Sequence, residues 1–98
     1  MSSTELIKKL DEAMPRLRSQ FGVDEIGLFG SQVRNDAKEN SDIDVLVKLN
    51  EPSFIKLAAL LNYLEMLFGK KVDITTKHKN LSPRFLKQIE NEIIYAHG

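Results

Sequence analysis

The sequence predicts an α/β or α+β fold in which a small mixed β-sheet is packed with helices. Three short apolar or alternating stretches are typical of strands, and segments with apolar residues at helical spacing precede, separate and follow them. The chain has 98 residues, of which 42% are hydrophobic and 29% are charged, an ordinary globular balance. We therefore expect one domain over residues 1–98.

The first helix is expected over about residues 3–20, where apolar side chains recur behind a serine that can cap the N-terminus. Pro15 removes a backbone hydrogen bond inside this pattern, so we expect a kink or a break there. Phe21 and Gly22 close the helix. Residues 25–30 are too few for a buried helix and predict a strand that ends in a tight turn.

The middle of the chain predicts a short helix over residues 31–35, a polar loop over 36–41 and a second strand over 42–47. Strict alternation in this strand puts Asp42, Asp44 and Leu46 on one face.

The C-terminal half begins with a broad apolar helix over residues 54–68, whose width predicts burial on more than one side. A strand over residues 71–76 carries Asp73. Ser82-Pro83 then caps a last helix, with apolar residues that continue to Ile93 and Ile94.

Three aspartates are the candidate catalytic and metal-binding residues. The strand period places Asp42 and Asp44 on one face, roughly 7 Å apart, and Asp73 lies in a similar strand. Carboxylates that converge repel one another by roughly 4 kcal/mol at 4 Å and an effective dielectric near 20, so bound cations would have to neutralise them. Two Mg²⁺ ions shared with substrate phosphates fit this requirement.

The turn after the first strand is the candidate nucleotide-binding element. Gly30 and Ser31 lie where a strand passes into a helix, so free backbone N–H groups and the Ser31 hydroxyl are expected to bind phosphates. Arg34, one turn later, offers a forked donor to the same phosphates.

These residues together resemble a known family. Gly30-Ser31, ten residues and then Asp42-x-Asp44 is similar to the signature of the DNA polymerase β nucleotidyltransferase superfamily, within the stretch GLFGSQVRNDAKENSDIDVLV. The whole chain, with KKVDIT around Asp73, resembles the minimal nucleotidyltransferases that act as antitoxins beside HEPN toxins. The resemblance implies a polymerase β-like nucleotidyltransferase fold, ATP as donor, AMP as the transferred group and a tyrosine hydroxyl of a HEPN-domain partner as acceptor.

Composition limits the partners. Fourteen Lys and Arg balance fourteen Asp and Glu, so binding to a long nucleic acid is disfavoured. The chain contains no cysteine, and neither a signal peptide nor an apolar run of about 20 residues is present, which predicts a cytoplasmic protein without membrane contact. A domain this small has a thin margin of stability, so we expect a hetero-oligomer or a homodimer.

Two other functions are compatible with the sequence. The chain could neutralise a toxin by binding alone, without catalysis, or it could transfer a nucleotide to a small molecule such as an antibiotic.

Overall fold

A computed structural model describes residues 2–34, 36, 41–78 and 80–97. Asn35 and most of the polar loop expected over residues 36–41 lie outside this part of the chain. Its elements are, in order, α1 (Ser3–Phe21), β1 (Val23–Phe29), α2 (Ser31–Arg34), β2 (Ile43–Leu49), α3 (Phe54–Phe68), β3 (Val72–Thr76), α4 (Pro83–Ile89) and β4 (Ile94–Tyr95).

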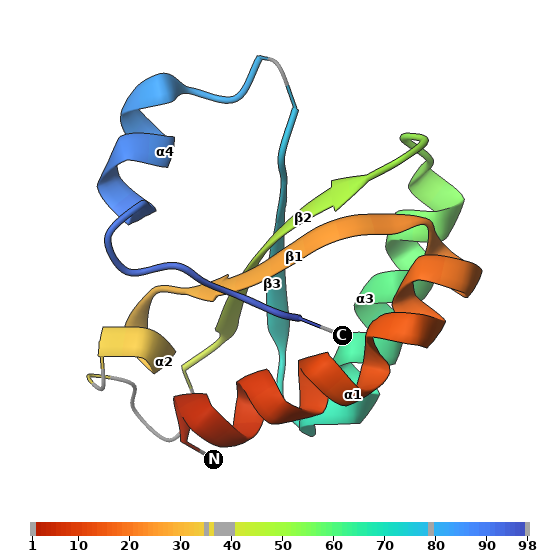
Figure 1. Cartoon of the computed structure of the whole chain (residues 1–98), viewed down its shortest axis with the longest axis horizontal. Coiled ribbons are helices and arrows are strands. Elements are labelled where there is room, and N and C mark those ends of the chain that lie inside the picture. The colour runs from red at the N-terminus through yellow and green to blue at the C-terminus, as the bar shows by residue number, and fades with distance from the viewer. Residues whose placement is uncertain (1, 35, 37–40, 79, 98) are drawn as a thin grey trace.

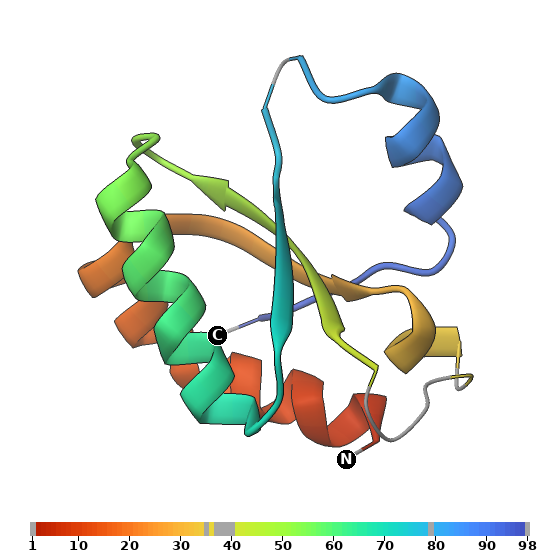
Figure 2. The ribbon, with the colours of Figure 1, turned by 180° about the vertical axis from the view of Figure 1, so that it is seen from behind.

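The strands form one mixed sheet in the order β3-β2-β1-β4. Strand β1 runs antiparallel to β2 and β4, whereas β2 and β3 are parallel. Helices α1 and α3 lie side by side against one face of the sheet, and α4 stands apart from them (Figure 1). The view from behind shows the same separation (Figure 2).

Helix α1 has the bounds that its pattern predicts. The Ser2 side chain accepts a hydrogen bond from the backbone N–H of Glu5, and Gly22 ends the helix in the left-handed conformation. Pro15 does not divide the helix, contrary to one expectation. Its side chain is exposed, so its ring displaces nothing from the core.

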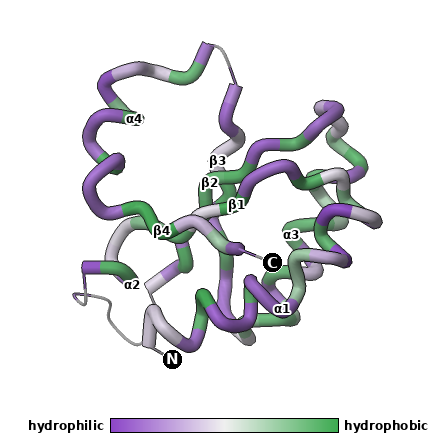
Figure 3. The backbone as a smooth tube through the Cα atoms, in the orientation of Figure 1, coloured by the Kyte–Doolittle hydropathy of each residue, from purple (hydrophilic) through white to green (hydrophobic). Residues whose placement is uncertain are grey.

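The main core lies between the sheet and the pair α1 and α3. Hydrophobic and hydrophilic residues alternate along α1 (Figure 3), as expected for a helix that covers a sheet with one face. Residues from both helices and from β1 and β2 are almost fully buried; they include Leu6, Leu10, Leu17, Ile26, Leu28, Ile43, Val45, Leu60 and Leu64. The predicted alternation in β2 therefore places Ile43 and Val45 in this core, on the face opposite to Asp44.

A second, smaller hydrophobic cluster lies on the other face of the sheet, beneath α4. Its buried members are Phe29 of β1, Leu46 of β2 and Ile89 of α4. Because Leu46 and Asp44 are two residues apart in one strand, both point to this face. Helix α4 thus partly covers the face of β2 that carries Asp44 and Leu46.

The last predicted helix is too long. Helix α4 ends at Ile89, and Ile94 pairs instead with Leu28 at the edge of β1. The β-branched pair Ile93-Ile94 favours an extended backbone, and the free edge of β1 provides hydrogen-bond partners for it. The turn between α4 and β4 therefore replaces the final helical turns.

The prediction that α3 is buried on more than one side is also wrong for the described residues. Leu60, Leu64 and Phe68 are buried, but Ile55 and Met66 remain 83% and 85% exposed. The helix packs on α1 and the sheet from one side only, because no other element of the described chain reaches its outer face.

Within the described residues, no helix combines the length and the apolar character needed to cross a membrane.

The one-sided burial of α3 gives the first prediction. Leu64→Ala should lower the free energy of unfolding by about 2–5 kcal/mol because it leaves a cavity in the core. Met66→Ala should change it by less than about 0.5 kcal/mol because its side chain is exposed. Urea denaturation of the isolated chain measures both. An equally large loss for Met66→Ala would mean that a second copy covers this face in solution.

Candidate functional site

Two of the three predicted aspartates lie opposite each other in neighbouring strands. Asp44 of β2 is in register with Asp73 of β3. Residues at paired positions point to the same face of a sheet, so both carboxylates lie on the face that α4 partly covers. Asp42 directly precedes β2 and is exposed, two residues before Asp44. The fold therefore brings together residues that are far apart in the chain.

The charges of these aspartates act on one another. Partial burial raises the pKa of Asp44, and the negative charges of Asp73 and then Asp42 raise it further. The positive charge of Arg34 lowers the pKa of Asp44. Asp44 is half-buried, whereas Asp42 and Asp73 are exposed. An ionised Asp44 is thus disfavoured by its surroundings, which a bound cation would reverse.

Gly30 lies in direct contact with Asp44. Its φ of 83° is in the left-handed region, and a Cβ atom added there would lie 2.3 Å from Asp44 Oδ2. Only glycine satisfies both constraints. The turn expected after β1 is therefore held against the carboxylate. The carbonyl of Gly30 accepts hydrogen bonds from the N–H groups of Val33 and Arg34, both at 3.1 Å. The four-residue helix α2 begins with these bonds.

The backbone N–H of Gly30 is not free, contrary to the expectation that it would be available to phosphate. It donates a hydrogen bond to Glu92 Oε2. Arg34 also contacts this residue, with Nη1 3.2 Å from Glu92 Oε2, and its Nε lies 3.2 Å from Asp36 Oδ2. Both contacts raise the pKa of Arg34, and the contact with Asp36 has the larger effect.

Sequence reasoning missed Glu92 altogether. It assigned this residue to a continuous last helix, where a single glutamate reads as an ordinary surface charge. No local signal distinguishes Glu92 from Glu90, because its role depends on the turn after α4 and on the pairing of β4 with β1.

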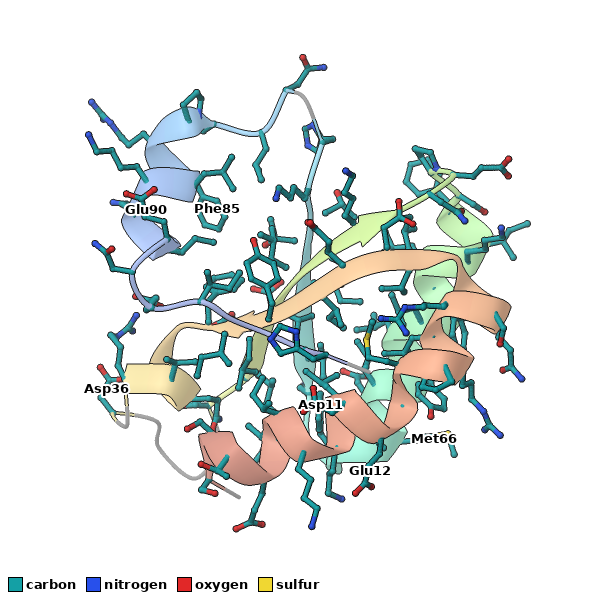
Figure 4. All side chains as sticks on the ribbon, viewed as in Figure 1. Asp11, Glu12, Asp36, Met66, Phe85 and Glu90 are labelled. Atoms are coloured by element: carbon teal, nitrogen blue, oxygen red, sulfur yellow. The ribbon has the colours of Figure 1, made fainter. Side chains whose placement is uncertain are left out.

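A cleft of about 590 Å³ connects these residues. It is lined by Phe29, Gly30, Arg34, Asp44, Asp73, Thr75, Phe85, Gln88, Ile89 and Glu92. Phe85 of α4 extends toward the sheet (Figure 4), and its ring meets that of Phe29 edge to face at 5.7 Å. The cleft thus joins an acidic floor to an apolar wall. Ser31, which is half-buried, and Asp42 are not among its lining residues.

Another cavity, of about 290 Å³, lies at the opposite end of β2 and β3. Half of its lining residues are apolar, namely Leu49, Pro52, Phe54 and Leu57, and none of its lining residues carries a carboxylate. The acidic cleft is therefore the better candidate for phosphate chemistry.

The donor set fits a hard divalent cation, since it consists of carboxylate oxygens on adjacent strand positions. In the described residues, however, no three His, Cys, Asp or Glu side chains are already grouped as a metal site. Binding a cation would require the aspartate side chains to turn toward one another, which the exposure of Asp42 and Asp73 allows.

Comparison with known proteins gives consistent matches. The family model described as "Nucleotidyltransferase domain" matches residues 7–96. The protein adenylyltransferase MntA of Thermococcus cleftensis is 48% identical over 81 residues, which are 82% of this chain and 81% of that protein. A presumed protein adenylyltransferase of Methanocaldococcus jannaschii is 45% identical over 80 residues, 81% of this chain and 82% of its own length.

Solved structures show the same architecture. A presumed minimal nucleotidyltransferase superposes with a TM-score of 0.76 at 35% identity, over 96% of this chain and 95% of that one. A toxin–antitoxin complex with AMP-PNP contains a chain with a TM-score of 0.65 at 23% identity, over 97% of this chain and 72% of that one. The second of these likenesses concerns the fold alone.

The contact between Gly30 and Asp44 gives the second prediction. Gly69→Ala, at a φ of 67° with open space around it, should cost about 1–2 kcal/mol for the left-handed backbone alone. Gly30→Ala carries the same backbone cost and in addition drives a methyl group into Asp44, so its loss of unfolding free energy should be clearly larger. Equal losses in thermal or urea unfolding would show that the turn can move away from Asp44.

The raised pKa of Asp44 gives the third prediction. When the pKa of a carboxyl is higher in the folded than in the unfolded state, the free energy of unfolding falls as pH rises from the unfolded pKa through the folded pKa. Ionised Asp44 therefore destabilises the fold at neutral pH. Asp44→Asn should therefore raise the melting temperature in EDTA at pH 7, and should do so less near pH 3. About 1 kcal/mol shifts the melting temperature of such a domain by roughly 4–8 °C, so calorimetry resolves the effect. A lower melting temperature for the variant at pH 7 would contradict the predicted repulsion.

Proposed function

We propose a specific reaction for this chain, which belongs to the nucleotidyltransferase domain family: it transfers AMP from ATP to a tyrosine hydroxyl of a HEPN-domain toxin. The observation that carries the proposal is the register of Asp44 with Asp73 at the floor of a cleft beside Gly30. The adenylyltransferase names of the relatives support AMP as the transferred group. A solved complex of an AMP-modified HEPN toxin with a minimal nucleotidyltransferase antitoxin supports a HEPN toxin as the acceptor protein.

The reaction forms a bond between the acceptor oxygen and the α-phosphorus of ATP. The bond from that phosphorus to the bridging β-phosphate oxygen breaks, and pyrophosphate leaves. Asp73 lines the cleft and its side chain is exposed, so its carboxylate takes the proton of the incoming hydroxyl. Gly30, Ser31 and Arg34 bind the phosphates of the donor.

Asp42, Asp44 and Asp73 would hold two Mg²⁺ ions. When bound, these ions supply positive charge that stabilises the attacking oxygen and the departing pyrophosphate. The ionised form of Asp44, which burial and the charges of Asp73 and Asp42 disfavour, would be stabilised by such an ion.

The proposed assembly is a hetero-oligomer of antitoxin and toxin, in which residues 1–98 form one nucleotidyltransferase domain. A solved complex of a HEPN toxin with a minimal nucleotidyltransferase antitoxin supports it. In this assembly the toxin presents its own tyrosine to the cleft. Because the donor is ATP, we assign the pair to the cytoplasm.

The fourth prediction tests this reaction. Incubation of the chain with its HEPN-domain partner, ATP and Mg²⁺ should add one or more AMP groups to the partner, measured by intact mass. Asp44→Asn should slow this transfer by roughly 100-fold or more, the scale seen when a group that stabilises transition-state charge is lost. Asp24→Asn, an exposed aspartate of β1 outside the cleft, makes the same chemical change and should transfer AMP normally.

Two outcomes would overturn the proposal. Normal transfer by Asp44→Asn would place the chemistry elsewhere. A stable complex that binds ATP but never modifies the partner would instead support neutralisation by binding alone.

A further inference from the structure

The Glu92 carboxylate occupies donors that the proposed function assigns to the triphosphate. Glu92 Oε2 accepts the N–H of Gly30, and it lies 3.2 Å from Arg34 Nη1, which is also 3.4 Å from Glu92 Oε1. The side chain of Glu92 is only 21% exposed. One carboxylate thus satisfies both a backbone donor and a guanidinium in the same cleft.

The position of Glu92 is set by its backbone rather than by this contact. Its N–H donates to the carbonyl of Ile89 at 2.9 Å, and the N–H of Ile93 donates to the same carbonyl at 2.8 Å. Ile89 is 7% exposed, and Ile93 packs against the same hydrophobic cluster. The turn therefore stays in place if the carboxylate swings out, so its release requires only a side-chain rotation.

Carboxylate and phosphate oxygens compete for the same kinds of donor. Both are anionic acceptors, and both make strong hydrogen bonds to backbone N–H groups and to arginine. Glu92 also adds a negative charge to a cleft that already contains Asp44 and Asp73. The negative charge of Glu92 therefore repels an entering triphosphate. The same carboxylate already binds the N–H of Gly30 and the guanidinium of Arg34, which the triphosphate needs as donors.

We infer that Glu92 is an internal competitor for the donor nucleotide, an autoinhibitory contact that the triphosphate must displace from Gly30 and Arg34. The inference rests on the proposed function, because it assumes that these two residues bind phosphate. Its consequence is selectivity by charge: a ligand with several anionic oxygens displaces the carboxylate, and a nucleoside without phosphate gains nothing from doing so.

Equilibrium binding tests the inference without any transfer reaction. Isothermal titration of ATP, with Mg²⁺ present, is compared for the wild-type chain and for Glu92→Gln. Removing one charged competitor for these partly exposed donors should tighten ATP binding by about three- to tenfold. Binding of adenosine, which carries no phosphate, should not change between the two proteins.

Glu90→Gln is the matched control. Glu90 lies two residues earlier, is exposed and projects from the end of α4 outside the cleft lining (Figure 4). The same loss of one negative charge should therefore leave ATP binding almost unchanged there. Melting curves establish that each variant is folded. If Glu92→Gln does not fold, Glu92→Asp replaces it, because a carboxylate that is shorter by one methylene should also release the donors and tighten binding.

The outcomes separate this inference from the proposed function. Unchanged or weaker ATP binding by Glu92→Gln, with wild-type transfer of AMP to the partner intact, would overturn the inference alone. Equal tightening by Glu90→Gln would reduce it to a general charge effect and overturn it as well. If neither wild type nor Glu92→Gln binds ATP, both the inference and the proposed function fail.

Discussion

The parallel register of β2 and β3 places two like charges beside each other on the face of the sheet that α4 partly covers. Asp44 and Asp73 meet because Ile43 pairs with Val72, and both of these apolar residues are buried in the main core. A shift of one residue would turn the branched side chains of β2 out of that core and the carboxylates into it. The stability of the core therefore enforces a repulsive pair on the opposite face. Such an arrangement is destabilising by itself and becomes favourable only when cations share the site.

The rest of the cleft is built around that pair. Gly30 lets the backbone after β1 approach Asp44 more closely than any side chain would allow. Helix α4 supplies Phe85 and Ile89 as an apolar wall, so the acidic floor is partly shielded from water while remaining open to a ligand. The Glu92 carboxylate accepts hydrogen bonds from Gly30 and Arg34 in the same cleft. Each charged group that lines the cleft thus either lies near a like charge or makes a hydrogen bond or an ion pair within the chain.

The architecture that holds this cleft is shared with a solved structure. The four-stranded mixed sheet and its helices match a solved structure of a presumed minimal nucleotidyltransferase over nearly the full length of both chains, which confirms the polymerase β-like nucleotidyltransferase fold. With this fold, two strands, the short helix α2 and the turn after α4 position the charged groups that line the cleft. An acceptor must then come from outside the cleft. The exposed outer face of α3, with Ile55 and Met66, shows that the described chain also leaves apolar surface uncovered.

Sequence patterns alone determined most of the elements and the candidate residues. Periodicity located α1, α3, β2 and β3, because each buries one face against the core and so repeats its apolar residues at the period of its backbone. Strand β1 was located as an apolar stretch between glycines that is too short for a buried helix. The spacing of Gly30-Ser31 and Asp42-x-Asp44 pointed to the candidate site, because it combines a turn that only glycine tolerates with carboxylates on one strand face. Only the tertiary structure decided the pairing of Asp44 with Asp73, the end of α4 at Ile89, the exposure of α3 and the contact of Glu92 with Gly30 and Arg34. These depend on which strand edges and helix faces meet, and contacts between residues far apart in the chain leave no local pattern to read.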